Sequence, residues 1–410
     1  MVEVEAASRR APRGRLTRVL VGALPLQFAF GLVYSWGAIA PFVEKDLHWS
    51  PLLLSAVFSA TPIGYGTGII VGGRLADRLP PRRLCWAGLA CLSIGLGIAL
   101  SFPTEATFIL GYAMLGLGFG GGLGLAGSIA ASRQAMPDRA GMAGGLVTGA
   151  YAIAAPIQVP VMSLLAAAFG WLPTLRGMAA AMLLIAAGTL SAMPAIPRPR
   201  QPAEDGRTHP SPWHLLVRPR VYTAILLEMA GTPLGAYAFV HAASYSHSLQ
   251  LTALVATGAI TAVAIGNALG RVGGGSLSDR HGVDRVMLVV LVIDLVAAAI
   301  LFLHPGGTAV VAGSVLAGLG FGAPAGVISR LAQDAAPDAP NTAFGLIFAG
   351  FAAGAGPGSL LGAAIGGTAA WPVLGAIALV GLVVVAFRLR LHRQITVLAE
   401  NNENAGQHDG

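Results

Sequence analysis

Long apolar stretches dominate this sequence and limit what it can fold into. Reading along the chain gives twelve stretches of about 20 mostly apolar residues, the length that an α-helix needs to cross the hydrocarbon core of a bilayer. The first six begin near residues 17, 53, 84, 106, 141 and 171, and the second six near residues 221, 250, 285, 307, 341 and 371. Only 10% of the residues are charged, too few to cover a soluble domain. The sequence therefore predicts an all-α membrane protein with twelve transmembrane helices.

The stretch between the sixth and seventh apolar segments has a different composition. Residues 194–220 are rich in proline and charge, which is typical of a solvent-exposed linker. We therefore expect an N-terminal six-helix bundle over residues 1–193, a linker over 194–220, a C-terminal six-helix bundle over 221–390 and a cytoplasmic tail over 391–410.

Basic residues gather on one side of the predicted spans. Arginines precede the first span, follow the second and fill the linker, whereas only Lys45 and Arg176 fall on the opposite side. Because cytoplasmic loops are enriched in arginine and lysine, both termini are predicted to be cytoplasmic, with the chain in a bacterial inner membrane. The net charge of +7 then reflects topology and gives no reason to expect a nucleic-acid partner.

An internal repeat relates the two halves of the chain. Four segments recur in the same order, 200 to 202 residues later. Such a constant offset indicates parallel copies of one six-helix unit, an arrangement that places the substrate site between the halves near mid-membrane. Since both halves lie in one chain, we expect a monomer to be functional. The pairs are Gly72–Arg78 with Gly274–Arg280, Gly116–Gly120 with Gly318–Gly322, Pro137 with Pro337, and Pro156 with Pro357.

The Gly-x-Leu-x-Asp-Arg element that ends the second and eighth spans resembles the cytoplasmic-loop signature of the major facilitator superfamily. The resemblance implies the superfamily fold, with two pseudo-symmetric six-helix bundles. It also implies a gating role for Asp77 with Arg78 and for Asp279 with Arg280, each aspartate facing a helix N-terminus and nearby arginines to lock the outward-facing state. The alternative is that these charges only set topology. The first copy departs from the signature at Pro80-Pro81.

Three further segments resemble the monocarboxylate transporter and oxalate/formate antiporter family within that superfamily. They are Gly31–Trp36, Met136–Gly141 and Gly270–Arg280. The resemblance implies a secondary transporter of small carboxylates and places the family's anion-binding arginine at Arg271.

Arg271 is the only basic residue inside a predicted span. It lies eight residues before Asp279, which is about 12 Å along a helix and close to mid-membrane. An arginine at that depth needs a cavity or a partner, and its planar fork matches one carboxylate. The alternative is a structural salt bridge to Asp294 or Glu228. Asn267, on the same helix face, is expected to bind a substrate hydroxyl or hold the guanidinium; its alternative is a helix–helix hydrogen bond.

The substrate class follows from the number of cations. The resemblance implies a lysine in the eleventh span of oxalate-type antiporters, but Asn341–Gly367 contains no basic residue. One cation suits one carboxylate, as in lactate, pyruvate or formate. Four more side chains are candidates for walls of the site, with core packing as the alternative for the aromatic ones. They are Tyr34, Tyr112, Phe321 and Gln27.

Three ionisable groups are candidates for proton coupling. His241 can titrate near neutral pH, and Asp294 and Glu228 are intramembrane acids. Each has a packing role as its alternative, and protonation of the substrate itself would give the same net transport.

These features together predict a secondary transporter that moves a small monocarboxylate with a proton by alternating access. The nearest alternative is an exchanger of one carboxylate for another. More remote alternatives are a transporter-like membrane sensor and a cation-coupled drug exporter. The sequence shows no nucleotide-binding loop, metal cluster or catalytic triad, so we expect no cofactor, no metal and no enzymatic activity.

Overall fold

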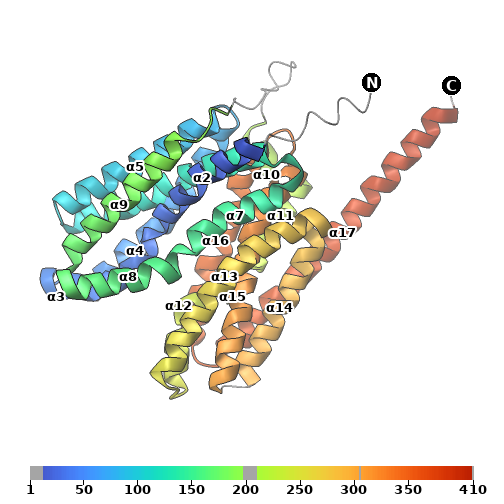
Figure 1. Cartoon of the computed structure of the whole chain (residues 1–410). Coiled ribbons are helices and arrows are strands. Elements are labelled where there is room, and N and C mark those ends of the chain that lie inside the picture. The colour runs from blue at the N-terminus through green and yellow to red at the C-terminus, as the bar shows by residue number, and fades with distance from the viewer. Residues whose placement is uncertain (1–12, 197–209, 304–305, 409–410) are drawn as a thin grey trace.

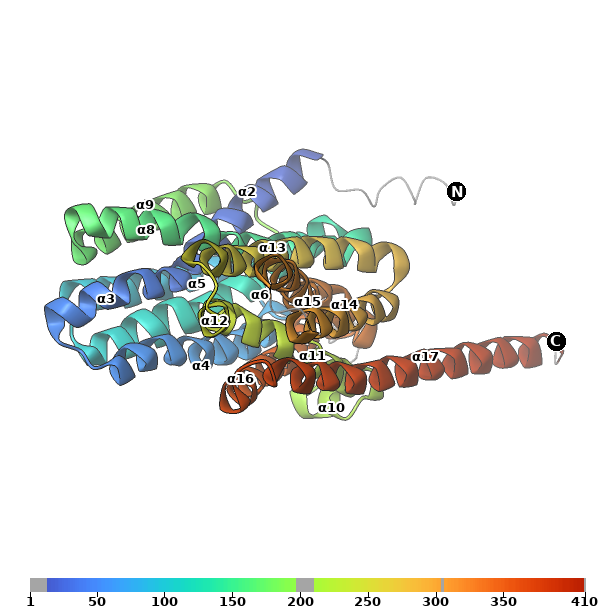
Figure 2. The same cartoon turned by 90° about the horizontal axis from the view of Figure 1, so that it is seen from below.

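The computed structural model describes residues 13–196, 210–303 and 306–408, and almost all of them are helical. No strand occurs among these residues. The helices run side by side in two groups, one formed by the first half of the chain and one by the second (Figure 1). The view in Figure 2 shows the two groups next to each other, with α17 extending beyond the rest.

The first group follows the predicted spans, and several spans consist of more than one helical segment. The first span is interrupted by a short 3-10 segment at Gly31–Ser35, and the fifth is broken beside Ile153, three residues before Pro156. The segments are α2 (Arg13–Phe30), η1 (Gly31–Ser35), α3 (Trp36–Leu47), α4 (Pro51–Ala76), α5 (Pro81–Ser101), η2 (Thr107–Gly120), α6 (Gly121–Ala135), η3 (Pro137–Arg139), α7 (Ala140–Ala152), α8 (Ala154–Phe169) and α9 (Trp171–Ser191).

The second group repeats this order with fewer interruptions. The seventh span breaks between Ala230 and Pro233, where proline removes a backbone donor from the helix. The segments are α10 (Pro212–Leu216), α11 (Pro219–Ala230), α12 (Pro233–Ser248), α13 (Ala253–His281), α14 (Val283–Leu303), α15 (Gly307–Ala335), α16 (Pro340–Ile365) and α17 (Ala370–His408).

The predicted membrane architecture is confirmed. Eleven helical stretches among the described residues are long and apolar enough to cross a membrane. The 26-residue helix α4 occupies the place of the predicted second span. Part of the predicted linker, residues 197–209, lies outside the described residues, and α10 lies in its remainder.

Glycines bring the two halves into backbone contact at the end that carries Asp77 and Asp279. A Cβ atom on Gly275 would collide with the backbone of Gly141, and one on Gly145 would collide with the backbone of Arg271. Small residues allow such close approach, which matters in lipid because burial of apolar surface does not drive helix association there. At the opposite end, α3 and α12 diverge (Figure 1).

Candidate functional site

Arg271 lies at the junction between the two halves. Its side chain is only 5% exposed, and its Nε atom donates to Oδ1 of Asn267 at 3.0 Å. One terminal nitrogen reaches across to the carbonyl oxygen of Thr148, on α7 of the first half, at 3.4 Å. A guanidinium has five N–H donors, so these two bonds leave donors available for a ligand.

The alternative of a structural salt bridge finds no support in the geometry. Within residues 13–196, 210–303 and 306–408, Arg271 forms no ion pair, and neither Asp294 nor Glu228 reaches it. A buried cation without an anion is costly. The uncompensated guanidinium is therefore the feature of the site that calls for an anionic ligand.

A closed circuit of seven aromatic side chains, here called the aromatic belt, joins the two halves. Neighbouring ring centroids are 5.3 to 6.1 Å apart, within the range of favourable aromatic contacts. Two of the belt members are buried, with 6% of their surface exposed, and the other five are only partly buried. In order, the members are Tyr34, Tyr151, Tyr65, Phe348, Phe351, Phe321 and Phe239.

The belt is chemically divided between the halves. Its three tyrosines come from η1, α4 and α7, and its four phenylalanines come from α12, α15 and α16. The guanidinium of Arg271 donates to the carbonyl oxygen of Thr148, one turn before Tyr151 on α7, and it acts electrostatically on Tyr34, Tyr65 and Tyr151. The belt therefore has a polar arc beside Arg271 and an apolar arc in the second half.

Two of the candidate wall residues do not join this site. Tyr112 packs against Trp36 and Phe108 in the first half, with ring centroids 5.7 and 5.4 Å away. Gln27 donates to the hydroxyl of Ser128 at 3.1 Å, which ties α2 to α6. The contacts of both are internal to the first half, whereas Tyr34 and Phe321 do lie in the belt.

The remaining five belt members could not be predicted as site residues, because no motif or charge in the sequence marks them. Aromatic residues are common in apolar helices, so each alone reads as packing. One usable signal was present: Tyr151 and Phe351 are 200 residues apart, the offset that separates Pro137 from Pro337.

The two intramembrane acids are buried in the second half. Asp294, on α14, is 2% exposed and packs against Gly320 of α15. Its Oδ1 atom, and both carboxyl oxygens of Glu228 on α11, have no hydrogen-bond partner among the described residues. His241 differs, because it is only partly buried and stacks on Tyr237 with ring centroids 4.7 Å apart.

The first of the two predicted gating aspartates, Asp77, crosses between the halves to cap a helix. The carboxylate of Asp77 accepts bonds from the backbone nitrogens of Asn341 at 3.2 Å and Thr342 at 2.8 Å, in the first turn of α16. The side chains of the same two residues donate to it at 2.8 and 2.6 Å. Helix N-termini favour negative charge, so this contact stabilises the approach of α4 to α16.

The second aspartate makes the symmetric contact with fewer bonds. Asp279 accepts from the backbone nitrogens of Gly141 at 2.8 Å and Met142 at 2.7 Å, in the first turn of α7. Arg330 lies 4.0 Å from the same carboxylate.

The arginines beside these aspartates are not the ones in the sequence motif. Arg78 and Arg280 are exposed, and their side chains form no hydrogen bond or ion pair within the part of the chain that the structure describes. At the first contact, Arg133 bonds the side-chain oxygen of Asn341 and acts electrostatically on Asp77. Neither Arg133 nor Arg330 was predicted as a site residue from the sequence.

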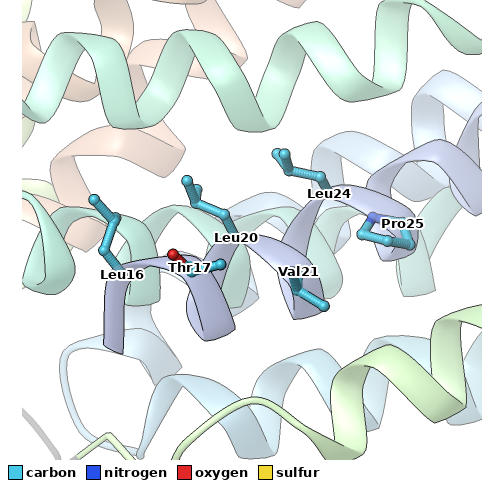
Figure 3. A pocket seen from close by; sticks show the side chains of 6 residues that line it. All are labelled: Leu16, Thr17, Leu20, Val21, Leu24 and Pro25. Carbon is cyan, nitrogen blue, oxygen red and sulfur yellow. The ribbon is translucent and has the colours of Figure 1, made fainter. Parts of the chain in front are cut away.

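Two surface hollows lie away from this site. Figure 3 shows the first, an apolar hollow lined by side chains of α2 from Leu16 to Pro25. The second runs along α13, α14 and α15 and includes Leu269 and Val289, which are 59% and 56% exposed. Exposed apolar residues are typical of lipid-facing surfaces of membrane spans, and the lining of neither hollow includes Arg271 or a belt member.

Sequence comparisons connect the chain to transporters. It is 24% identical over 294 residues to the uncharacterized MFS-type transporter YhjX of Escherichia coli, which covers 70% of this chain and 72% of that protein. It is 28% identical over 137 residues to the putative niacin/nicotinamide transporter NiaP of Bacillus subtilis, but the match spans only 32% of this chain and 34% of NiaP.

Solved structures share the fold. FucP, a Major Facilitator Superfamily transporter solved in the outward conformation, has a TM-score of 0.70 at 15% identity, covering 91% of this chain and 98% of that one. The proton:xylose symporter XylE, bound to 6-bromo-6-deoxy-D-glucose, has a TM-score of 0.68 at 14% identity, covering 92% and 96%.

The family model named Major Facilitator Superfamily matches residues 23–259 and 229–406, which together include most of the chain. This match agrees with the repeated six-helix units and with the motif pair that ends at Arg78 and Arg280. The chain belongs to the Major Facilitator Superfamily and is a multi-pass membrane transporter.

Proposed function

We propose that this transporter moves one small monocarboxylate together with a proton across the bacterial inner membrane by alternating access. The observation that carries the proposal is the buried guanidinium of Arg271, which has no anionic partner among the described residues. An arginine at the centre of a membrane helix costs about 2.5–3.5 kcal/mol on insertion scales, so its retention needs a functional partner. A carboxylate fits its fork with two parallel hydrogen bonds.

The charge of the site favours one carboxylate over two. Helix α16, which faces the site through Phe348 and Phe351, has no basic residue between Asn341 and Ile365. A dianion would leave one charge without a partner. Lactate, pyruvate and formate carry one carboxylate, as does niacin, which is named for the Bacillus relative.

The buried acids support proton coupling. A carboxyl oxygen inside the membrane without a hydrogen-bond partner marks a candidate proton carrier. Oδ1 of Asp294 and both carboxyl oxygens of Glu228 have no such partner among the described residues. We favour them over His241, which is only partly buried and already stacked on Tyr237. The structural relatives FucP and XylE are named as proton symporters, which supports the same mechanism.

The direction of opening follows from the positive charges. If the arginine-rich loops are cytoplasmic, so are both termini and the end held by Asp77 and Asp279. We then infer an outward-facing state, closed at the cytoplasmic end by the helix-capping contacts of Asp77 and Asp279. Release of both caps would let the halves rock about Arg271 and open the other side.

Proteoliposome uptake tests the proposal. Labelled L-lactate, pyruvate and nicotinate are offered with an imposed inward proton gradient and no internal substrate. We expect at least one to accumulate, and a protonophore to abolish the accumulation. Uptake only after the lumen is preloaded with another carboxylate would replace symport by exchange. No carboxylate flux under either condition would overturn the proposed substrate class.

A further inference from the structure

The division of the aromatic belt constrains the shape of the substrate. Arg271 and the three tyrosines form a polar side that can hold a carboxylate, and the opposite side consists of four phenylalanines. Formate or lactate is small enough to bind at the polar side alone. Such a substrate would leave the phenylalanine arc without a role in recognition.

The spacing of the phenylalanines suits a flat apolar ligand. The ring centroids of Phe321 and Phe348 both lie 5.3 Å from that of Phe351, and the ring centroids of Phe239 and Phe321 are 6.1 Å apart. Aromatic pairs prefer centroid separations of about 4.5–7 Å, so a further ring added beside these would find the same geometry. Phe321 and Phe239 are only partly buried, which leaves ring surface for a ligand to cover.

The belt also crosses the moving boundary between the halves. The ring centroids of Tyr34 and Phe239 are 5.8 Å apart, and those of Tyr65 and Phe348 are 5.9 Å apart. Each pair joins the first half to the second. A ring held at these junctions would touch both halves at once. Its binding would then be linked directly to their relative movement.

We propose that the physiological substrate is an aromatic monocarboxylate, bound with its carboxylate on Arg271 beside the tyrosine arc and its ring against the phenylalanine arc. This inference rests on the proposed function, because it takes the carboxylate site at Arg271 as given. It replaces the short aliphatic acids by acids of the benzoate and nicotinate class.

Equilibrium binding is the suitable test, because neutral benzoic acid crosses lipid without a carrier. Isothermal titration of the full chain in nanodiscs compares benzoate, nicotinate, cyclohexanecarboxylate and L-lactate. We expect the two aromatic acids to bind at least about tenfold tighter than L-lactate, and several-fold tighter than the saturated ring of similar size.

Substitutions in the belt locate the effect. Phe321→Leu and Phe351→Leu should each weaken benzoate binding by about three- to tenfold more than they weaken L-lactate binding. Phe351→Tyr keeps a ring and should keep the preference. Phe344→Leu is the matched control, because Phe344 lies on α16 one turn from Phe348 but outside the belt.

The outcomes separate this inference from the proposed function. If L-lactate binds and the aromatic acids bind no better, the inference fails and the carboxylate transporter stands. Equal binding of benzoate and cyclohexanecarboxylate, or equal loss of benzoate and lactate in folded leucine variants, also overturns the aromatic preference. If no carboxylate binds, the proposed function itself fails.

Discussion

The two halves share one architecture but differ in where they carry charge. Glycines of each half pack against equivalent positions of the other: Gly145 against the backbone of Arg271, and Gly345 against the backbone of Ile69. Arg271 and Ile69 are 202 residues apart, the offset of the repeat. For every ionisable candidate inside the second half, the residue at the equivalent position of the first half is apolar. The first-half residues at that offset are Leu26 for Glu228, Ile39 for His241, Ile69 for Arg271 and Leu92 for Asp294.

This difference indicates a division of labour between the halves. The first half supplies the tyrosine arc and one side of each predicted gate, and the second half supplies the cation and the buried acids. Because the packing contacts are equivalent, the charged residues of the second half are not needed to build the fold. They are therefore the residues whose substitution should change transport more than stability.

The largest effect should come from the Arg271 and Ile69 pair. Arg271→Ala leaves the substrate carboxylate without its partner, and losses of this kind typically exceed about 2 kcal/mol, so uptake should fall at least about 30-fold. Ile69→Ala, at the equivalent buried position, should reduce thermal stability but leave uptake per folded molecule within about twofold. Initial rates normalised to folded protein measure both, and equal losses would contradict the division of labour.

The next effect concerns the buried acids. Asp294→Asn should reduce proton-driven accumulation by about tenfold, because the amide cannot carry the proton, while substrate exchange across the membrane is retained. Glu228→Gln is assayed in parallel to decide which acid is required. Accumulation and counterflow are measured on the same liposomes. Full accumulation in both variants would assign the proton to the substrate itself.

A smaller effect should distinguish the two gates. Asp77 accepts four hydrogen bonds and Asp279 accepts two. Asp77→Asn should therefore raise hydrogen exchange of the first-turn amides of α16 by about tenfold, and Asp279→Asn should raise that of α7 by about threefold. Hydrogen–deuterium exchange mass spectrometry measures both peptides. The reverse order would show that bond number does not set gate strength.

The smallest effect should follow from loss of the exposed ion pair between Arg218 and Asp338 in the second half. Arg218 and Asp338 form two bonds of 2.6 and 2.8 Å, and this hydrogen bonding raises the pKa of Arg218. Both side chains are about two-fifths exposed, so Arg218→Ala should cost about 1 kcal/mol or less. A thermal midpoint unchanged within a few degrees, with normal uptake, is the expected result. A large loss of stability would mean that this exposed pair holds the second half together.

Much of the fold could be predicted because membrane helices carry strong signals. Apolar length gives the spans, and the repeat gives their pairing into equivalent units. The position of Arg271 and its bond to Asn267 also follow from spacing on one helix. These features depend on residues close together in sequence or on a fixed offset.

The rest depends on contacts between distant helices. Whether Tyr112 or Tyr151 faces the site is decided by how α7 and η2 pack, and no charge or motif marks the difference. The exposure of Arg78 and Arg280 could not be predicted from the sequence for a similar reason. Their places beside the gates are taken by Arg133 and Arg330, which arrive from other helices.

The most direct test of the account compares acids with their amides. Binding of nicotinate and nicotinamide, and of L-lactate and lactamide, is titrated to the wild-type chain and to Arg271→Gln in nanodiscs. The account predicts that the wild type prefers at least one acid over its amide by about tenfold or more, and that Arg271→Gln removes this preference. A preference for the acid that survives in folded Arg271→Gln would contradict the assignment of Arg271 as the carboxylate site.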